Sequence, residues 1–554
     1  MEILSSSSSK LNGYEYAGKG ATIFMVAACI TAASGAIIFG YDLGISGGVT
    51  SMDDFLLKFF PRVYEQKNSA KTDNYCKFDS QVLTAFTSSL YLAALVTNLL
   101  ASVVTSRYGR RACILTGGIC FMVGSVLNGA AQDLAMLLLG RIVLGLGLGF
   151  TTQTVPLYLS EMAPPGLRGG LNSMAQIALC IGVVSAYLIN YGTARIKPWG
   201  WRISLGSSIF PSIFITLGAV FLPDTPSSLI ERGKCEHALL VLQKMRGTLD
   251  VQAEYNDLLE ASRVVKAVGN HPWSHILKPK YRPVLVMAFG IPWFQQFTGI
   301  NIVTFYAPVL FQTLGLGSNA SLYSSVILGG AGLLAAILAA VLVDKAGRRS
   351  LLFHGSLQMF ITLVIIAVVL YMDLGAHNMV SRNMAILLVV TVCVYVAAFG
   401  WSWGPVGTLV PSEVFPLEVR AAGQSINIGV VLFFIFAGAQ LFLAMLCHLK
   451  AGLFLFMACW VFLSALFVYF LLPETKGQKR ERSSDPDTKG KKKMQVELEK
   501  PFMVQRETSV LQGLTSELLA RHDTLIFWAV VNNPNGERMA VIKQPESFQQ
   551  LLSS

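Results

Sequence analysis

Three amide side chains lie within one long apolar stretch of the sequence. Residues 286–308 are apolar and long enough to cross a bilayer, yet they include Gln295, Gln296 and Asn301. Gly299 and two prolines interrupt the same stretch. An amide that faces lipid would leave its donors and acceptors unpaired, so we expect these amides to face protein, water or a ligand. A helix loosened near Gly299 would aim Gln295 and Asn301 at one cavity, as in transporter binding sites. The alternative is that the amides only join neighbouring helices.

Two charged residues lie within other apolar stretches. Asp42, in IIFGYDLGISGG, ends the first stretch, and Arg141, in LLLGRIVLGLG, opens the apolar core of the fourth. A charged side chain inside a membrane segment is unfavourable, so each marks a functional site by default. Burial favours a neutral carboxyl, whereas a nearby arginine favours the carboxylate. A pair that separates during a conformational change would therefore switch its proton affinity, the alternative being a static buried ion pair.

The composition indicates a membrane protein. Of the 554 residues, 53% are hydrophobic and only 14% are charged, whereas soluble domains are about one quarter charged. The formal net charge of +11 is carried by loops and by the C-terminal tail, which indicates membrane topology and not nucleic-acid binding. No cleavable signal peptide is recognisable, so the first apolar stretch is expected to act as the insertion signal. Twelve stretches are predicted to span the bilayer: 21–43, 81–104, 112–131, 134–156, 170–193, 201–222, 283–313, 322–343, 350–373, 385–410, 421–446 and 450–472.

The positions of the basic loops predict the orientation. Basic loops follow the second and eighth spans, which places these loops and both termini in the cytoplasm. Residues 50–80 are then extracellular, and so is Asn319, which begins a glycosylation triplet.

The sequence repeats itself at about half the length of the membrane region. TSRYGRRACILTGG is echoed by VDKAGRRSLLFHGS, and PLYLSEMAPPGLRGGLNS by LVPSEVFPLEVRAAGQS. Such a repeat predicts an all-α membrane protein built from two similar six-helix bundles. The predicted parts are a cytoplasmic N-terminus (1–20), a first bundle (21–222) with an extracellular lid (50–80), a cytoplasmic helical linker (223–282), a second bundle (283–472) and a partly disordered cytoplasmic tail (473–554).

Charged residues recur at the same relative places in both halves. Ion pairs among them would latch helix ends on one side of the membrane, and breaking these pairs would let the halves rock. The alternative is that the charges only set the topology. The candidate latch residues are Arg110, Arg111, Glu161 and Arg168 in the first half and Arg348, Arg349, Glu413 and Arg420 in the second.

Other motifs do not support an enzyme. Three glycines at alternate positions, Gly145 to Gly149, resemble a phosphate loop, but no strand precedes them, and close helix packing explains them better. The seven histidines show no metal-ligand spacing. We find no nucleophile elbow, metalloprotease motif or nucleotide-binding loop, so we expect no enzyme, metal or cofactor.

The motifs together resemble a known family. GRR after the second and eighth spans, PDTPSSLIERG, QQFTGINIVTFYAP, GWSWGPVGTLVPSEVFPLEVR and PETKG are similar to motifs of the sugar porters of the major facilitator superfamily. Within these, the chain most resembles the plant sugar transport proteins, which are proton/hexose symporters. The resemblance runs from about residue 15 to residue 477.

The resemblance implies roles for particular residues. Asp42 would accept the proton with Arg141 as its partner, and Cys76 would be disulfide-bonded to Cys447, tying the lid to the second half. The partners would be a monosaccharide, a proton and the lipid bilayer, without nucleic acid, and the protein would act as a monomer in the plasma membrane. Residues implied to contact the sugar are Phe39, Gln176, Gln295, Gln296, Asn301 and Gly404.

Three departures from the family pattern concern the sugar site. Gly332 and Val431 stand where the family has asparagines, and Thr408 stands where it has a tryptophan. Amides bind hydroxyls and a flat ring covers the C–H face of a sugar, so we expect weak hexose binding or a larger, less polar substrate. His354 also replaces a glutamate on the predicted cytoplasmic side.

The sequence thus predicts a proton-coupled symporter that imports a monosaccharide by alternating access. The alternatives are a sugar receptor of the same fold without net transport, and a proton-independent facilitator. In the tail, two apolar runs around Asn533 to Gly536 predict a small strand pair, and the alternative there is a read-through end.

Overall fold

The computed structural model describes residues 22–69, 74–163, 168–267, 276–313, 317–376, 382–415, 419–471, 528–532 and 538–542. The predicted N-terminus (1–20) and most of the predicted tail lie outside these residues.

The described membrane region is helical. The first half and the linker contain α1 (Ile23–Ser51), α2 (Asp53–Phe59), α3 (Pro61–Asn68), the short 3-10 helix η2 (Asn74–Cys76), α4 (Gln81–Tyr108), α5 (Arg110–Ala130), α6 (Leu134–Met162), α7 (Arg168–Thr193), α8 (Gly200–Gly206), α9 (Ile209–Phe221), α10 (Pro226–Glu231), α11 (Cys235–Arg246) and α12 (Gln252–Ala267). The second half contains η3 (Pro279–Tyr281), α14 (Arg282–Phe297), α15 (Ile300–Phe305), α16 (Ala307–Thr313), α17 (Ser318–Ala346), α18 (Arg348–Ala376), α19 (Arg382–Trp401), α20 (Trp403–Val414), α21 (Arg420–Leu449) and α22 (Gly452–Leu471).

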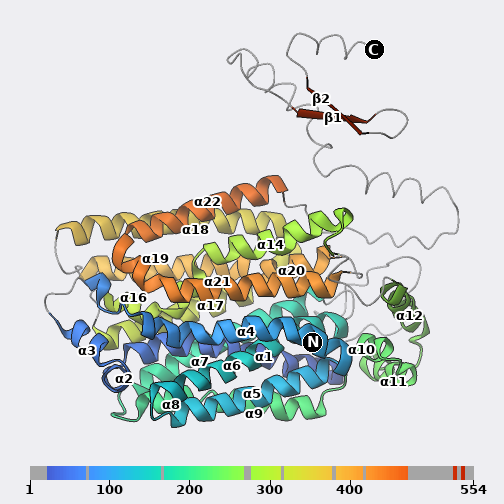
Figure 1. Ribbon diagram of the computed structural model, residues 1–554, viewed down its shortest axis with the longest axis horizontal. Helices are drawn as coiled ribbons and strands as arrows, with labels where there is room; N and C mark the ends of the chain where they lie inside the picture. The colour runs from blue at the N-terminus through green and yellow to red at the C-terminus, as the bar shows by residue number, and fades with distance from the viewer. Residues whose placement is uncertain are drawn as a thin grey trace. The chain divides into compact units, whose positions relative to one another are not determined.

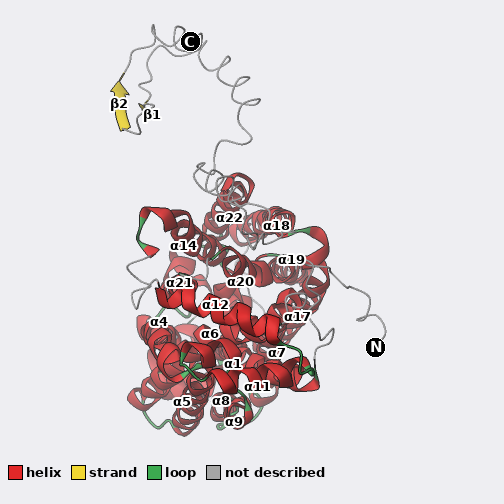
Figure 2. Cartoon of the chain, turned by 90° about the vertical axis from the view of Figure 1, so that its right-hand side faces the viewer, coloured by secondary structure: helices red, strands yellow, loops and turns green. Residues whose placement is uncertain are grey.

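These helices account for the predicted spans. Within the described residues, eleven segments are long and apolar enough to cross a membrane, and α14 supplies a shorter apolar helix where the seventh span is predicted. Figure 1 shows two groups of roughly parallel helices, one built around α1 and α4 to α9 and the other around α14 and α17 to α22. The short helices α2 and α3 lie at one end of the helices, and α10 to α12 lie at the opposite end (Figure 1). The view along the helices in Figure 2 shows the same two groups.

Glycines allow close helix packing in the first half. A Cβ atom at Gly145 would lie 2.2 Å from the carbonyl oxygen of Leu90 in α4, and one at Gly149 would lie 2.5 Å from that of Ala94. Between them, Gly147 faces α5, with the carbonyl oxygen of Gly117 2.8 Å away. The prediction that these glycines serve close helix packing is confirmed.

Helix α1 is longer than the sequence predicts. The expected span ends at residue 43, but α1 continues to Ser51, so the prediction that Asp42 ends the span is wrong. The glycines after Asp42 do not end the helix because each one contacts a neighbour closely. Gly44 faces α7, and a Cβ at Gly47 would lie 2.0 Å from the carbonyl oxygen of Phe305 in α15. Asp42 therefore lies inside a continuous helix.

The seventh span is interrupted as predicted. Gly299 separates α14 from α15 and has φ +82°, a left-handed conformation that favours glycine. A Cβ here would lie 2.5 Å from Sδ of Met457 in α22, so a side chain would also have to displace Met457. Two tyrosine hydroxyls donate to backbone carbonyls of this interrupted span: Tyr395 to that of Thr298, just before the break, and Tyr187 to that of Thr304, near the end of α15, each at 2.5 Å.

Two smaller parts complete the description. The linker contains α11 and α12 where the sequence predicts helices, and Arg246 joins them through an ion pair with Glu254 at 2.6 Å. In the tail, which forms a separate unit from Gly477 onward, β1 (Trp528–Asn532) pairs antiparallel with β2 (Arg538–Ile542). The strand pair predicted there is confirmed.

Candidate functional site

The centre of the first half contains a buried ion pair. Nη1 of Arg141 in α6 lies 2.5 Å from Oδ1 of Asp42 in α1. Arg141 is 1% exposed and Asp42 is 7% exposed, so both charges are almost fully removed from solvent. Asp133, whose carboxylate accepts a hydrogen bond from the Met136 amide, caps the N-terminus of α6 and so sets where Arg141 lies along it.

Further donors and acceptors satisfy the pair. Nη2 of Arg141 donates to Oγ of Ser46 at 2.6 Å, and Nε donates to the carbonyl of Phe86 in α4 at 3.2 Å. The Phe86 ring also lies 4.8 Å from the guanidinium. The second carboxylate oxygen of Asp42 accepts a hydrogen bond from the Tyr91 hydroxyl at 3.3 Å. A buried pair with this many partners is stable while Asp42 is ionised and loses its main charge interaction when Asp42 is neutralised.

A small pocket adjoins the ion pair. Its other lining residues are mainly apolar and come from α1, α4, α5, α6 and the α8–α9 region: Ile38, Tyr41, Ile45, Leu90, Phe121, Leu144, Leu148, Leu205 and Ser208. An apolar surrounding strengthens the attraction between Asp42 and Arg141 and penalises either charge alone.

The amides of the seventh span lie on both sides of its break. Gln295 and Gln296 are on the last turn of α14, and Asn301 is on α15. Nδ2 of Asn301 donates to Oε1 of Gln296 at 2.7 Å across the Gly299 turn. Gln295 donates to the carbonyl of Trp403 in α20 at 3.0 Å, so one of its bonds does join helices, as the alternative interpretation predicts.

Glycines of α20 bring amides from both halves together. A Cβ at Gly404 would lie 3.1 Å from Nε2 of Gln176, which comes from α7 of the first half. A Cβ at Gly407 would lie 2.7 Å from Nε2 of Gln295 in the second half. Gln176 and Gln295 therefore approach successive turns of one helix face, and only glycine leaves both amides in place.

Of the other predicted sugar contacts, the structure describes the surroundings of Phe39, Gly332 and Val431. Phe39 and Val431 are half-buried and pack against the core. The Cα–Cβ direction at Gly332 points to Val396 of α19, whose Cγ1 would lie 3.3 Å away, and not to an amide. The side chain of Thr408 lies outside the described part of the structure.

The predicted latch of the first half contains one expected ion pair and one that the sequence did not predict. Nη2 of Arg110 lies 2.7 Å from Glu161, as expected, and Nη1 lies 2.7 Å from Glu231 of α10. Arg111 donates instead to the carbonyl of Ala219 at 3.2 Å and to that of Val220, both in α9. These contacts join α5, α6, α9 and α10, all of which belong to the first half or the linker. The predicted pairing of Arg110 with Glu161 is therefore present, and its role as a latch during transport stays a prediction.

The second latch is described only in part. Arg349 donates to the carbonyl of Tyr469 in α22 and lies over its ring at 5.6 Å. Arg348 begins α18. The side chains of Arg168, Glu413 and Arg420 lie outside the described part of the structure, so a role for them stays a prediction.

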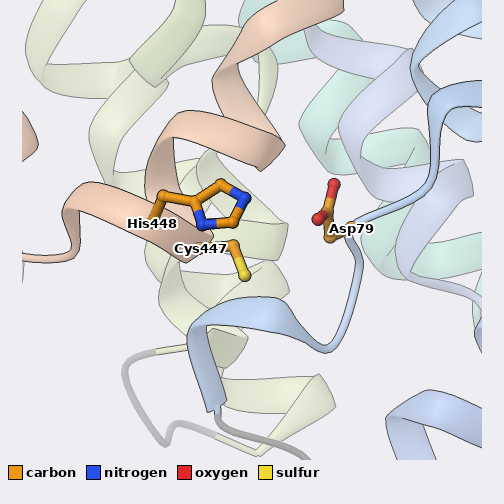
Figure 3. Close-up of side chains that lie close together, drawn as sticks. All are labelled: Asp79, Cys447 and His448. Carbon is orange, nitrogen blue, oxygen red and sulfur yellow. The ribbon is translucent and has the colours of Figure 1, made fainter.

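Cys76 and Cys447 form a disulfide between η2 and α21, with Cα atoms 4.6 Å apart. This bond ties the predicted lid to the second half, as the resemblance implies. Figure 3 shows that Asp79 and His448 lie beside Cys447. Because Sγ of Cys447 is used in the disulfide, only two potential metal ligands remain, too few for a metal site.

Several residues that build the site were not singled out by the sequence. Tyr91 and Ser46 contact the ion pair, and Gly407 faces an amide. Glu231 forms the second ion pair of Arg110. The two glycines of GPVGT are three residues apart, which places them on one helix face. This spacing is the one signal that would have indicated Gly407. Tyr91 lies in an ordinary apolar segment and carries no such signal.

Known proteins share this sequence and fold. A family model described as "Sugar (and other) transporter" matches residues 28–484. Sugar transport protein 7 of Arabidopsis thaliana is 55% identical over 463 residues, which cover 84% of this chain and 90% of that protein. Sugar transport protein MST4 of Oryza sativa subsp. japonica is 53% identical over 466 residues, with the same two coverages.

Solved transporter structures have the same architecture. The major facilitator superfamily proton:xylose symporter XylE, bound to 6-bromo-6-deoxy-D-glucose, matches with a TM-score of 0.69 and 25% identity over 82% of this chain and 97% of that chain. A partially occluded inward-open XylE from E. coli matches with a TM-score of 0.67 and 23% identity over 82% of this chain and 100% of that chain. The predicted all-α architecture of two six-helix bundles is confirmed. The family model and the curated relatives agree, and the chain therefore belongs to the sugar transporter family of the major facilitator superfamily and not to a family of enzymes.

Proposed function

We propose that this protein is a proton-coupled symporter that imports a monosaccharide, most simply a hexose, by alternating access. The observation that carries the proposal is the buried Asp42–Arg141 pair, which lies in the same bundle as Gln176. The most similar relatives are named as sugar transport proteins, and a structural relative is a proton:xylose symporter.

The pair gives a physical means of coupling. While Asp42 is ionised, Arg141 is held 2.5 Å from it, and the two charges compensate each other in an apolar surrounding. A proton on Asp42 removes that compensation, so Arg141 must find other partners or become more hydrated. This change favours a different arrangement of α1 and α6, which is the conformational response that a symporter requires.

The amide cluster supplies the sugar site. Gln176, Gln295, Gln296 and Asn301 each offer a donor and an acceptor, which suits hydroxyl groups, and Phe39 would cover an apolar face of the sugar. Gly332, Thr408 and Val431 supply neither an amide nor a ring. We therefore expect a monosaccharide to bind here more weakly than in a site that has a full set of polar contacts.

Orientation and location belong to the same proposal. The protein would lie in the plasma membrane as a functional monomer. Both termini, the linker and Arg110 with its two ion pairs would lie on the cytoplasmic side. The α2–α3 lid and its disulfide would face the outside, where disulfides persist. The Arg110 contacts would hold α10 against the first bundle during transport.

Uptake into proteoliposomes tests the proposal. Purified protein is reconstituted, and labelled glucose and xylose are offered with and without an inward proton gradient. Accumulation above the external concentration that an uncoupler abolishes is the expected result. Equilibration without accumulation would identify a facilitator, and binding without uptake would identify a receptor; either would overturn the proposal.

A further inference from the structure

We propose that Tyr91 is a positioning residue that connects the ionisation of Asp42 to the position of α15, and through α15 to closure of the predicted extracellular end. The proposal rests on the proposed function and adds to it the structural element by which the proton site in one half acts on the other half. It is carried by contacts that Tyr91 makes on two sides.

The first contact is with the proton site. Tyr91 is 0% exposed, and its hydroxyl donates to Oδ2 of Asp42 at 3.3 Å while Arg141 occupies Oδ1. The charged or titratable groups around this hydroxyl come from three elements: Asp42 of α1, Arg141 of α6 and Tyr306, which follows α15. A hydroxyl that donates to a carboxylate forms a stronger hydrogen bond than one that donates to a neutral carboxyl. Protonation of Asp42 therefore weakens the bond that holds Tyr91 in place.

The second contact is with the broken helix of the other half. The rings of Tyr91 and Phe305 meet in an edge-to-face arrangement, with centroids 6.0 Å apart and an interplanar angle of 63°. Phe305 is 1% exposed, and its carbonyl oxygen would lie 2.0 Å from a Cβ at Gly47. Gly47 follows Asp42 on α1 by little more than one turn. α15 therefore rests on α1 and α4 at the point where these helices hold the proton site.

The position of α15 also decides whether this end of the molecule is closed. Short contacts between the halves gather near it: Tyr187 of α7 donates to the carbonyl of Thr304 at 2.5 Å, and the Tyr306 hydroxyl lies 2.8 Å from Oγ1 of Thr87. α15 is also short and separated from α14 by the Gly299 turn, so it moves without bending a long helix. Release of Tyr91 would thus loosen α15 and favour opening to the outside when a proton is bound.

Three variants separate this role from simple packing. Tyr91→Phe keeps the ring contact with Phe305 and removes only the hydroxyl that meets Asp42. Phe305→Leu keeps the hydroxyl and removes the ring contact. Tyr306→Phe is the matched control, because its hydroxyl lies in the same interface but bonds to Thr87 and to the carbonyl of Ala439, not to Asp42.

The first readout is the pH at which proton-driven glucose uptake is half-maximal. Tyr91→Phe removes a donor that favours the ionised carboxyl, so protonation becomes easier and the midpoint moves to higher pH by about one unit. Tyr306→Phe removes no hydrogen bond to Asp42 and should move the midpoint by much less. A Tyr91→Phe midpoint equal to that of the unaltered protein, or an equal shift in Tyr306→Phe, would overturn the proposal.

The second readout does not depend on transport. Amide hydrogen exchange of residues 300–305 is measured at acidic and neutral pH and corrected for the intrinsic rate. In the unaltered protein, acid should raise the corrected exchange of this segment by about threefold or more, and both Tyr91→Phe and Phe305→Leu should remove most of that dependence. Tyr306→Phe should retain it. An unchanged pH dependence in Phe305→Leu would disprove the connection, even if the unaltered protein transported no sugar and the proposed function had failed.

Discussion

The two halves of the molecule share one architecture, but their described residues bury different kinds of polar side chain. Among the described residues, the buried charged side chains are Asp42, Arg110, Arg141 and Arg246, and all of them belong to the first half or the linker. The described part of the second half buries amides such as Gln295, Gln296 and Asn427, without a buried charge. Among the described residues, the two halves thus share their helices but not their buried charges.

The backbones differ in the same way. In the first half, α1 runs unbroken for 29 residues and continues past Asp42 to Ser51, and its glycines serve close contacts. In the second half, the corresponding span is divided at Gly299 and again at Tyr306 into α14, α15 and α16. A buried ion pair requires fixed partners, which continuous, tightly packed helices provide. A neutral binding site benefits from a break that turns side chains toward one another.

The largest effect is expected from the charge in the first half. Asp42→Asn keeps the shape of the side chain but removes the titrating group, so uphill accumulation of labelled sugar should fall to equilibration, a ratio of about one. Exchange of sugar down its gradient should survive in part. The variant leaves Arg141 without its counter-charge, so the melting temperature of the purified protein is measured in parallel.

Asp53→Asn is the matched control for Asp42→Asn. Asp53 pairs with Lys67 at 2.8 Å on the predicted lid and is partly exposed, so its loss should matter little. Concentration of sugar by Asp42→Asn at acidic external pH would show that the proton site is elsewhere.

The second prediction restores polar groups to the second half. Gly332→Asn, Thr408→Trp and Val431→Asn together should tighten glucose binding by about tenfold or more, because two amides and an aromatic ring are each worth about 0.5–1.5 kcal/mol. At position 332 the new Cβ must displace Val396 by a few tenths of an ångström. Isothermal titration measures the affinity. Val431→Leu, which adds volume without an amide, should not tighten it, and an unchanged affinity in the triple variant would place the site elsewhere.

The third prediction concerns the glycines that admit the amides. Gly407→Ala puts a methyl group 2.7 Å from Nε2 of Gln295, and this flexible amide can move away without unfolding the helix. Glucose affinity should therefore fall by about tenfold while the melting temperature is kept. Gly330→Ala is the control, since its Cβ would meet nothing within 4 Å. Equal affinities in the two variants would argue against Gln295 as a sugar contact.

The smallest effect is expected from the bond that joins the halves. Cys76→Ala should lower the accumulation ratio by about threefold and make transport more sensitive to pH, because the lid is no longer tied to α21. Cys459→Ala, which removes an exposed free thiol, should have no effect. Mass spectrometry of protein purified without reductant checks the bond directly, and two free thiols would refute it.

Much of the fold follows from local sequence. The spans follow from runs of apolar residues, which need no tertiary information because lipid excludes unpaired backbone groups. The break at Gly299 and the helices of the linker were likewise predicted correctly. The end of α1 was not, because the glycines after Asp42 resemble helix breakers until the neighbours that they contact are known.

The sequence by itself determined the architecture, the family, and the residue types that carry charge and hydrogen bonds, because hydrophobicity and motif spacing are properties of short segments. Only the tertiary structure decided which further groups meet: Asp42 with Tyr91, Gln176 and Gln295 with the glycines of α20, and Arg110 with Glu231. These contacts join residues that are far apart in the chain. Their geometry depends on how closely whole helices approach each other, and a local sequence pattern does not determine that distance.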